Sequence, residues 1–220
     1  MRVAVAVLLT ANLAAAVASG QSTAPRPPEP RGLFPSFRIT SDYRFQGVRL
    51  SDRQPAVQLS LHWLLPEGIY AGVWMSRVDF DDPTDTWLEV DLYAGRRFRI
   101  RGNEVRLEAM YNSFNEGDVG RTYDFFQAKV LVDRNLGRIA FGTTTALSPS
   151  GSYGAGVTLH THARAAMDVT SLVAVTGSAG VGFVEHRRNR AYWDVGVTTT
   201  LSGLSLDLRY TDTNLRPESG

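Results

Sequence analysis

Cysteine is absent from this chain of 220 residues, and so is any strong excess of one charge. Without thiols the protein has neither a disulfide framework nor a thiolate metal site, so its stability has to come from backbone pairing and packing. A net charge of +1 and a hydrophobic content of 43% give no sign of a nucleic-acid-binding protein or of a disordered chain. The length suits a single domain.

Long apolar runs are also missing beyond the first twenty residues. A membrane-spanning helix needs about twenty predominantly apolar residues. The longest later stretch, 172–184, contains three glycines and several small residues, which suit a strand in a barrel wall better than a helix. The sequence therefore predicts no spanning helix.

The N-terminus has the composition of a secretory leader. A short basic start is followed by an apolar stretch and by Ala-Val-Ala at 16–18, the small residues typical of a cleavage site. We therefore predict a signal peptide at 1–20 and export of the rest of the chain. The proline-rich residues 21–35 are predicted to be a flexible periplasmic linker.

Most of the remaining chain alternates between apolar and polar residues, as a strand with two different faces does. Leu88, Val90 and Leu92 share one face, for example, and Glu89 and Asp91 share the other. The pattern predicts eleven strands, at 36–46, 55–65, 69–78, 86–100, 103–114, 123–133, 138–147, 152–163, 170–184, 191–201 and 204–213. Only the stretch 170–184 is apolar or small on both faces, so its orientation is not predicted.

Long and short connections alternate along the chain, as the external loops and periplasmic turns of bacterial barrels do. We therefore predict an all-β fold, an antiparallel up-and-down transmembrane β-barrel of about 12 strands at residues 36–220, in the cell outer membrane. Eleven of these strands are found, and the last residues, 214–220, do not form an amphipathic strand. Because an open strand edge is costly in lipid, the prediction includes a missing final strand.

Several segments carry a family resemblance. Residues 39–48, Ile-Thr-Ser-Asp-Tyr-Arg-Phe-Gln-Gly-Val, with Ser-Asp at 51–52 and Pro-Ala-Val-Gln at 55–58, resemble the opening of the TorF family of porin-like proteins. Residues 68–76 and 89–95 continue the resemblance, which covers the first third of the mature chain. Leu-Ser follows Gln58 where a glycine pair is expected, and the family's final strand is absent. The resemblance implies an outer-membrane barrel with porin activity and no assigned substrate.

The phase of the alternation predicts that charged side chains of both signs line the lumen. A barrel of about twelve strands is intermediate between a filled eight-stranded barrel and a sixteen-stranded pore. The charges either line a narrow channel for passive passage of small solutes, or pair across the lumen and close it. A closed barrel would have a structural, adhesive or ligand-binding role. The predicted lumen residues are Arg38, Asp42, Arg44, Glu89, Asp91, Arg106, Glu108, Lys129, Asp133, Asp207 and Arg209.

Arg38, Asp42 and Arg44 are spaced so that they share one face of the strand predicted at 36–46. There they would form a charged constriction that acts on passing solutes. The alternative, which we favour, is a ladder of salt bridges to acidic residues of the neighbouring last strand.

Three other groups of residues suggest chemistry but have simpler explanations. The acidic segment 79–85 has carboxylates for calcium, but it lacks the glycine and distal glutamate of an EF-hand, so we favour a solvated loop. His160 and His162 share a strand face without an identifiable third metal ligand, which favours lumen lining. Ser60 and His62 have no surrounding nucleophile motif. We predict no enzyme activity, no cofactor and no metal.

The main competing fold is a soluble periplasmic β-barrel or sandwich that binds a ligand or partner. The same alternation arises when the apolar face is a packed core and the charged face meets solvent. The apolar face is rich in alanine, valine, leucine and threonine, and the connections alternate in length; both observations favour contact with lipid. The expected partners are therefore outer-membrane lipid and small solutes.

Overall fold

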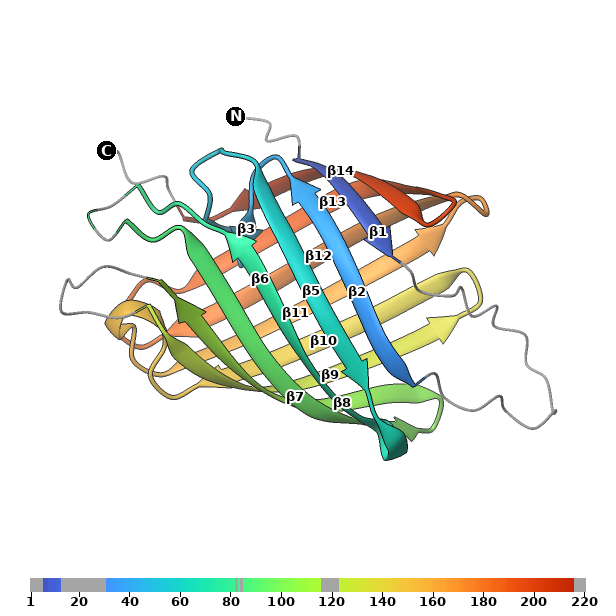
Figure 1. The fold of residues 1–220 in the computed structure, drawn as a ribbon, viewed down its shortest axis with the longest axis horizontal. Coiled ribbons are helices and arrows are strands. Elements are labelled where there is room, and N and C mark those ends of the chain that lie inside the picture. Colours follow the sequence, from blue (N-terminus) through green and yellow to red (C-terminus); the bar gives the residue numbers. More distant parts are fainter. Residues whose placement is uncertain (1–5, 13–30, 82, 84, 116–122, 216–220) are drawn as a thin grey trace.

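The chain is folded almost entirely into antiparallel strands. The structure is a computed structural model that describes residues 6–12, 31–81, 83, 85–115 and 123–215. Eleven strands form one sheet in which each strand pairs with the next along the chain (Figure 1). They are β2 (Gly32–Thr40), β5 (Ala56–Leu64), β6 (Ile69–Arg77), β7 (Leu88–Ile100), β8 (Asn103–Phe114), β9 (Phe125–Leu136), β10 (Ile139–Ser148), β11 (Thr158–Asp168), β12 (Val173–Val184), β13 (Arg190–Leu201) and β14 (Leu204–Thr213).

Helical structure in these residues is limited to two short 3-10 turns, η1 (Pro66–Gly68) and η2 (Ser152–Gly154). No helix in the described part of the chain has the length and hydropathy needed to cross a membrane.

The predicted alternation of long and short connections is confirmed. We call one end of the sheet the long-connection end and the other the short-turn end. The long connections are 41–55, 78–87, 115–124, 149–157 and 185–189, and the short ones are 65–68, 101–102, 137–138, 169–172 and 202–203. Nine of the eleven predicted strands lie within three residues of the observed ones.

The strand predicted at 152–163 is wrong in its first half. β11 begins at Thr158, and residues 149–157 form a long connection that contains η2. Gly151, Gly154 and Gly156 all have positive φ angles there, which an extended strand does not accommodate. The apolar residues among these glycines gave the misleading alternation.

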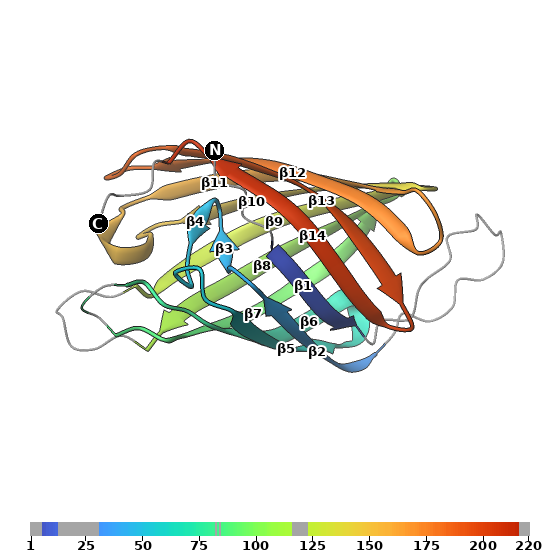
Figure 2. The same cartoon turned by 90° about the horizontal axis from the view of Figure 1, so that it is seen from above.

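The strand predicted at 36–46 is wrong at both ends. β2 begins at Gly32, so it includes residues assigned to the linker, whose residues 21–30 lie outside the described part of the chain. β2 then ends at Thr40, and residues 44–49 form a separate two-stranded hairpin, β3 (Arg44–Phe45) with β4 (Val48–Arg49). Figure 2 shows this hairpin within the outline of the curled sheet, near the long-connection end.

The gap between the first and last strands of the sheet is filled by β1 (Ala6–Asn12). β1 pairs antiparallel with β14, from Ala6 opposite Arg209 to Ala11 opposite Leu204, and also with β2. With β1 in place, every strand of the sheet has a hydrogen-bonded neighbour on each side. The eleven strands at 32–213 alone leave two free edges, and β1 comes from the segment predicted to be the signal peptide.

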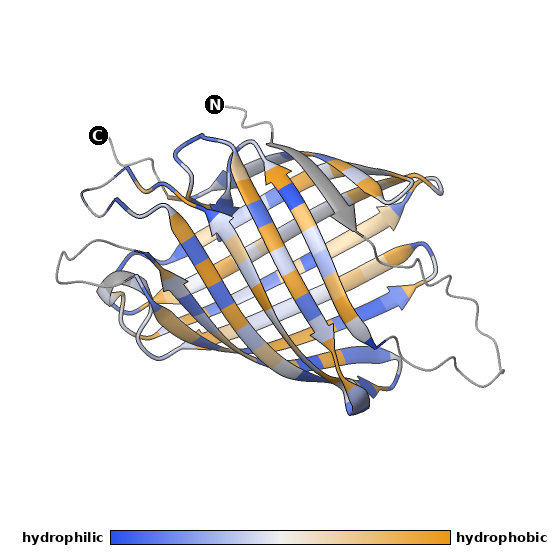
Figure 3. Cartoon of the chain, viewed as in Figure 1, coloured by the Kyte–Doolittle hydropathy of each residue, from blue (hydrophilic) through white to orange (hydrophobic). Residues whose placement is uncertain are grey.

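The two faces of the curled sheet differ in polarity. Large apolar side chains are exposed on the outer face, among them Leu59 at 44%, Val195 at 46% and Leu206 at 49%. Charged and polar side chains lie on the inner face, and Figure 3 shows the resulting alternation of orange and blue along the strands. β12, whose orientation the sequence left open, turns Ser178 inward and Phe183 outward.

Fully buried side chains gather at the long-connection end. The largest of them are Val78, Asn112, Ser51, Ser76 and Ser148, which lie in or beside the long connections. Most of this buried set is polar, so the interior at this end is a hydrogen-bonded core and differs from the apolar core of a soluble barrel.

Candidate functional site: a charged chamber and an inward-folded hairpin

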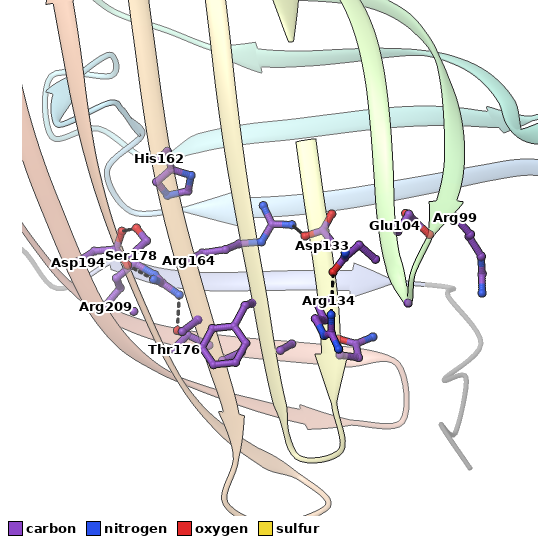
Figure 4. Close-up of a pocket in the computed structure, with 18 residues that line it drawn as sticks. Arg99, Glu104, Asp133, Arg134, His162, Arg164, Thr176, Ser178, Asp194 and Arg209 are labelled. Atoms are coloured by element: carbon purple, nitrogen blue, oxygen red, sulfur yellow. Dashed lines mark hydrogen bonds and ion pairs between the residues drawn. The ribbon is translucent and has the colours of Figure 1, made fainter. Parts of the chain in front are cut away.

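A cavity of about 1060 Å³ lies inside the sheet toward the short-turn end (Figure 4). Its lining carries charges of both signs among apolar residues such as Ala140 and Ala166. The labelled lining residues are Arg99, Glu104, Asp133, Arg134, His162, Arg164, Thr176, Ser178, Asp194 and Arg209. We call this cavity the chamber. The predicted lumen residues Asp133 and Arg209 are among them.

Asp133 on β9 joins three strands at the chamber wall. It accepts a hydrogen bond from Arg106 Nη2 of β8 at 2.6 Å and another from Arg164 of β11. Arg106 also lies 3.7 Å from Glu104, measured from Nε to Oε1. Arg164 lies beside Gly142 of β10, where a side chain would overlap both the guanidinium and Asp133. Because Gly142 has no side chain, the ion pair between Arg164 and Asp133 can pass over β10.

Arg209 on β14 is the centre of a second network. Its guanidinium donates to Asp194 of β13, to Asp207 at 3.0 Å and to Thr176 of β12 at 2.8 Å. Asp207 is also an electrostatic neighbour of Arg38 on β2. The salt bridge predicted between Arg38 and the last strand stays a prediction.

Replacing Arg209 tests how much this network stabilises the fold. Arg209→Met leaves Asp194 and Asp207 without their cation. We expect the free energy of unfolding to fall by about 2–4 kcal/mol, less than for a fully buried pair because the site is partly hydrated. Urea titration of the protein folded in lipid vesicles measures the change. Arg134→Met, at an exposed position on β9, is the control. An equal loss in both variants would contradict this role.

A third cluster of predicted lumen residues lies on β7, β8 and β9. Glu108 Oε1 is 3.6 Å from Lys129 Nζ, and Glu108 Oε2 accepts a hydrogen bond from Tyr70 at 3.1 Å. Asp91 accepts from Asn112 Nδ2 at 2.6 Å. Glu108 and Lys129 therefore form an ion pair between the neighbouring strands β8 and β9, while Asp91 of β7 is held by a neutral amide donor.

Glu89 differs from these paired groups. Only 3% of this residue is exposed, and its Oε2 has no hydrogen-bond partner among the described residues. A buried carboxyl oxygen without a partner raises the free energy of the state that buries it.

Aromatic rings lie flat against the inner wall where the neighbouring strand has a glycine. Tyr93 of β7 is directly opposite Gly72 of β6, and Tyr192 of β13 is directly opposite Gly180 of β12. A β-carbon at either glycine would overlap the tyrosine ring. His160 stacks on Tyr192 with a centroid distance of 5.6 Å and an interplanar angle of 6°. Each glycine therefore provides the space for a ring.

The hairpin has a tight turn that its backbone angles identify. Gln46 and Gly47 have φ angles of 52° and 78°, the pair of positive values found in type I′ turns. Asp42 accepts from Arg44 Nε at 2.8 Å and from Arg49 Nε at 3.2 Å. Asp42 and Arg44 are therefore bonded within the hairpin region, and the predicted row of Arg38, Asp42 and Arg44 on one strand face is wrong, because β2 ends before Asp42 is reached.

Tyr43 anchors the base of the hairpin to the wall. Its ring lies 5.6 Å from the ring of Trp74 on β6, and Glu89 of β7 is an electrostatic neighbour of its hydroxyl. Burial, and then the carboxylates of Glu89 and Asp91, raise the pKa of Tyr43, so its hydroxyl stays protonated and able to donate.

The tip of the hairpin reaches β13 and β14. Arg190 Nη1 of β13 donates to Gln46 Oε1 at 3.4 Å. A β-carbon at Gly47 would lie 2.8 Å from Tyr192 Cβ and 3.0 Å from Thr213 Cβ. The hairpin thus extends from the wall formed by β6 and β7 to the wall formed by β13 and β14.

The alternation of polarity did not indicate Tyr43 or the hairpin, and it did not indicate Arg164 and Asp194 as network members. The Gln-Gly pair at 46–47 between alternating residues is a weak hairpin signal that could have indicated the turn. The alternation of polarity puts both Arg164 and Asp194 on the inner face, but the partner of each depends on the strand register.

Residues that suggested other chemistry are engaged elsewhere. Ser60 is hydrogen-bonded to Ser36 at 2.7 Å, and His62 Nδ1 lies 3.1 Å from the Tyr93 hydroxyl. Among the residues that the structure describes, no three His, Asp or Glu side chains converge as metal ligands would. Asp82 and Thr84 of the predicted acidic loop lie outside them.

Comparison with known proteins gives one family. Residues 27–219, which include every strand from β2 to β14, match the model of a family described as "Bacterial protein of unknown function (Gcw_chp)". No curated protein matches the chain. The matched description mentions neither porins nor the TorF family.

Proposed function

We propose, from the premise that the chain belongs to the Gcw_chp family of bacterial proteins of unknown function, that it is a porin-like β-barrel of the bacterial outer membrane. Small solutes would pass through it without a covalent reaction. The proposal includes the TorF resemblance, export by a signal peptide at 1–20, and an enclosed lumen in the mature protein.

The distribution of polarity between the two faces carries this proposal. Exposed leucine, valine and phenylalanine side chains cover the outer face of strand after strand, while the salt-bridge networks lie inside. Soluble proteins rarely expose apolar surface over so large an area, and a soluble barrel would have the reverse arrangement. Lipid contact supplies the reason for an apolar exterior around a charged interior.

The mature barrel needs a strand in the place of β1. Free backbone groups along β14 and β2 would be unsatisfied in lipid, where each costs several kcal/mol. β14 and β2 run parallel to one another, because β1 is antiparallel to both. One additional strand, antiparallel to its neighbours, completes a twelve-stranded up-and-down barrel.

The chamber supports passage of small polar solutes of either charge. Arg106 and Arg164 are paired with Asp133, and Arg209 is paired with Asp194, so the wall has strong local fields but little excess charge. The buried core at the long-connection end favours the second candidate, a barrel that is closed and has a structural, adhesive or ligand-binding role.

Fractionation and electrical recording test the proposal together. The protein should stay with outer membranes after washing with salt and alkali, and the purified protein should give discrete conductance steps in planar bilayers. Asp133→Asn should shift the reversal potential in a salt gradient toward anion selectivity, because Arg106 and Arg164 lose their carboxylate. Glu67→Gln, on an exposed short turn, is the matched control. Recovery in the soluble periplasm, or a folded barrel with no conductance in any variant, would contradict the proposal.

A further inference from the structure

The hairpin at 42–49 occupies the interior at the end opposite the chamber. Its base contacts Trp74 and Glu89, and its tip contacts Tyr192 and Thr213. These contacts belong to strands that are far apart in the strand order. The hairpin therefore crosses the interior between two distant walls, while the chamber is lined by residues near the short turns.

We propose that this hairpin is a displaceable plug that closes the external mouth of the channel. The inference rests on the proposed function, and it adds the element that controls access from outside. In this proposal the hairpin separates the chamber from the long-connection end, and its displacement would open the chamber toward that end.

Few contacts hold the hairpin against the walls. Its ladder contains two residue pairs, Arg44 with Arg49 and Phe45 with Val48. Its tip is held to β13 by one side-chain hydrogen bond of 3.4 Å. Wall strands, in contrast, pair over most of their length. The residues that follow the hairpin are also held to the 78–87 connection, by a hydrogen bond of 2.7 Å from the Asp79 N–H to the Leu50 carbonyl oxygen and by a bridge between Ser51 and Asp79. Displacing the hairpin breaks these few interactions and leaves the sheet intact.

The closed arrangement also contains an unfavourable group that displacement would relieve. Glu89 Oε2 is buried without a hydrogen-bond partner, and Glu89 is an electrostatic neighbour of Tyr43. Movement of Tyr43 would let water reach this oxygen, and its hydration would offset part of the lost contact with Trp74. The two arrangements are therefore closer in free energy than the buried area of Tyr43 alone would suggest.

Internal bonds let the hairpin move as one body. Asp42 bonds both Arg44 and Arg49, so it joins the two strands of the hairpin at their base. Asp52 and Arg53 follow with φ angles of 36° and 62°, values that most residues rarely adopt. A change at these two residues, with Leu50 and Ser51 released from Asp79, would move the hairpin without altering β5.

A reversible cross-link tests the proposal directly. The chain has no cysteine, so Gly47→Cys with Thr213→Cys introduces the only two thiols. Their β-carbons would be 3.0 Å apart, and a shift of roughly 0.5–1 Å gives disulfide geometry. Oxidation should lock the plug and suppress conductance, and reduction should restore it. Each single-cysteine variant is a control that should not respond to oxidation, and Gly47→Cys alone also measures the strain of a β-carbon at this positive φ, 2.8 Å from Tyr192 Cβ.

A shortened loop gives the opposite perturbation. Replacement of residues 44–49 by two glycines should raise the conductance several-fold and lengthen open times, while the chain still folds to a protease-resistant barrel. Conductance that is unchanged by both the shortened loop and the oxidised cross-link would overturn the plug while leaving the channel. Silence in every folded variant, including the shortened one, would instead remove the proposed function. Failure of the thiols to cross-link would place the hairpin outside the mouth and also overturn the plug.

Discussion

Residues 21–220 are expected to form a stable barrel only when an additional strand occupies the place of β1. The structure pairs β1 with six residues of β14 and four residues of β2. Without a replacement, these edges would present free N–H and C=O groups to lipid. We therefore expect chains lacking any such strand to remain unfolded or to aggregate when transferred from urea into detergent or vesicles. Heat-modifiable migration in SDS gels and resistance to trypsin measure the difference.

The replacement strand can be specified from the register. It follows β14 through a turn beyond Thr213, runs antiparallel to β14, and is apolar at the positions opposite Leu204, Leu206 and Leu208. A matched control moves the apolar residues by one position, which reverses the faces while keeping composition. The designed strand should restore folding and the control should not. Full heat modifiability of residues 21–220 alone would contradict the need for this strand.

Thr145→Arg is expected to lower the free energy of unfolding in a bilayer by about 2–4 kcal/mol, because the arginine would enter lipid near the middle of a strand. Thr145 is exposed on the outer face of β10, and its hydroxyl oxygen lies 3.3 Å from that of Thr161 on β11. Urea titration in vesicles, followed by tryptophan fluorescence, measures the loss.

Thr144→Arg is an unusually close control for this experiment. It changes the same residue type at the adjacent position, but Thr144 is on the inner face, opposite His162. The inner face already holds several arginines, so we expect a smaller loss there. A soluble barrel would give the reverse result, since surface substitutions usually change stability by less than about 0.5 kcal/mol. Equal losses would contradict the assignment of the two faces.

Alternation predicted the strands whose two faces differ clearly. In β7, Glu89 and Asp91 alternate with Val90 and Leu92, and the strand is found where this pattern lies. Glycine and proline explain where the prediction failed. Pro35 made the start of β2 resemble a linker, although it is paired with Leu61 just beyond the residues that face β1.

The candidate site was less predictable than the wall, because its contacts depend on register. The alternation of polarity alone predicted that Arg106 and Arg209 point inward. It could not predict that Asp133, which pairs with Arg106, also forms an ion pair with Arg164 across β10. The hairpin was missed for a different reason. Residues 41–49 continue the strand-like alternation of β2, and only the φ angles at the turn and the bonds of Asp42 separate them from it.

The paired glycines and tyrosines of the inner wall have a consequence for assembly. A slip of two residues between β6 and β7 would keep every apolar side chain facing outward, so hydropathy does not oppose it. In one direction the slip would bring Tyr70 opposite Tyr93, and in the other it would bring Trp74 opposite Tyr93. Either arrangement places two large rings in a space that now holds one ring and a glycine. The glycine–tyrosine pairs therefore disfavour a two-residue slip in register that the alternation of polarity alone would permit.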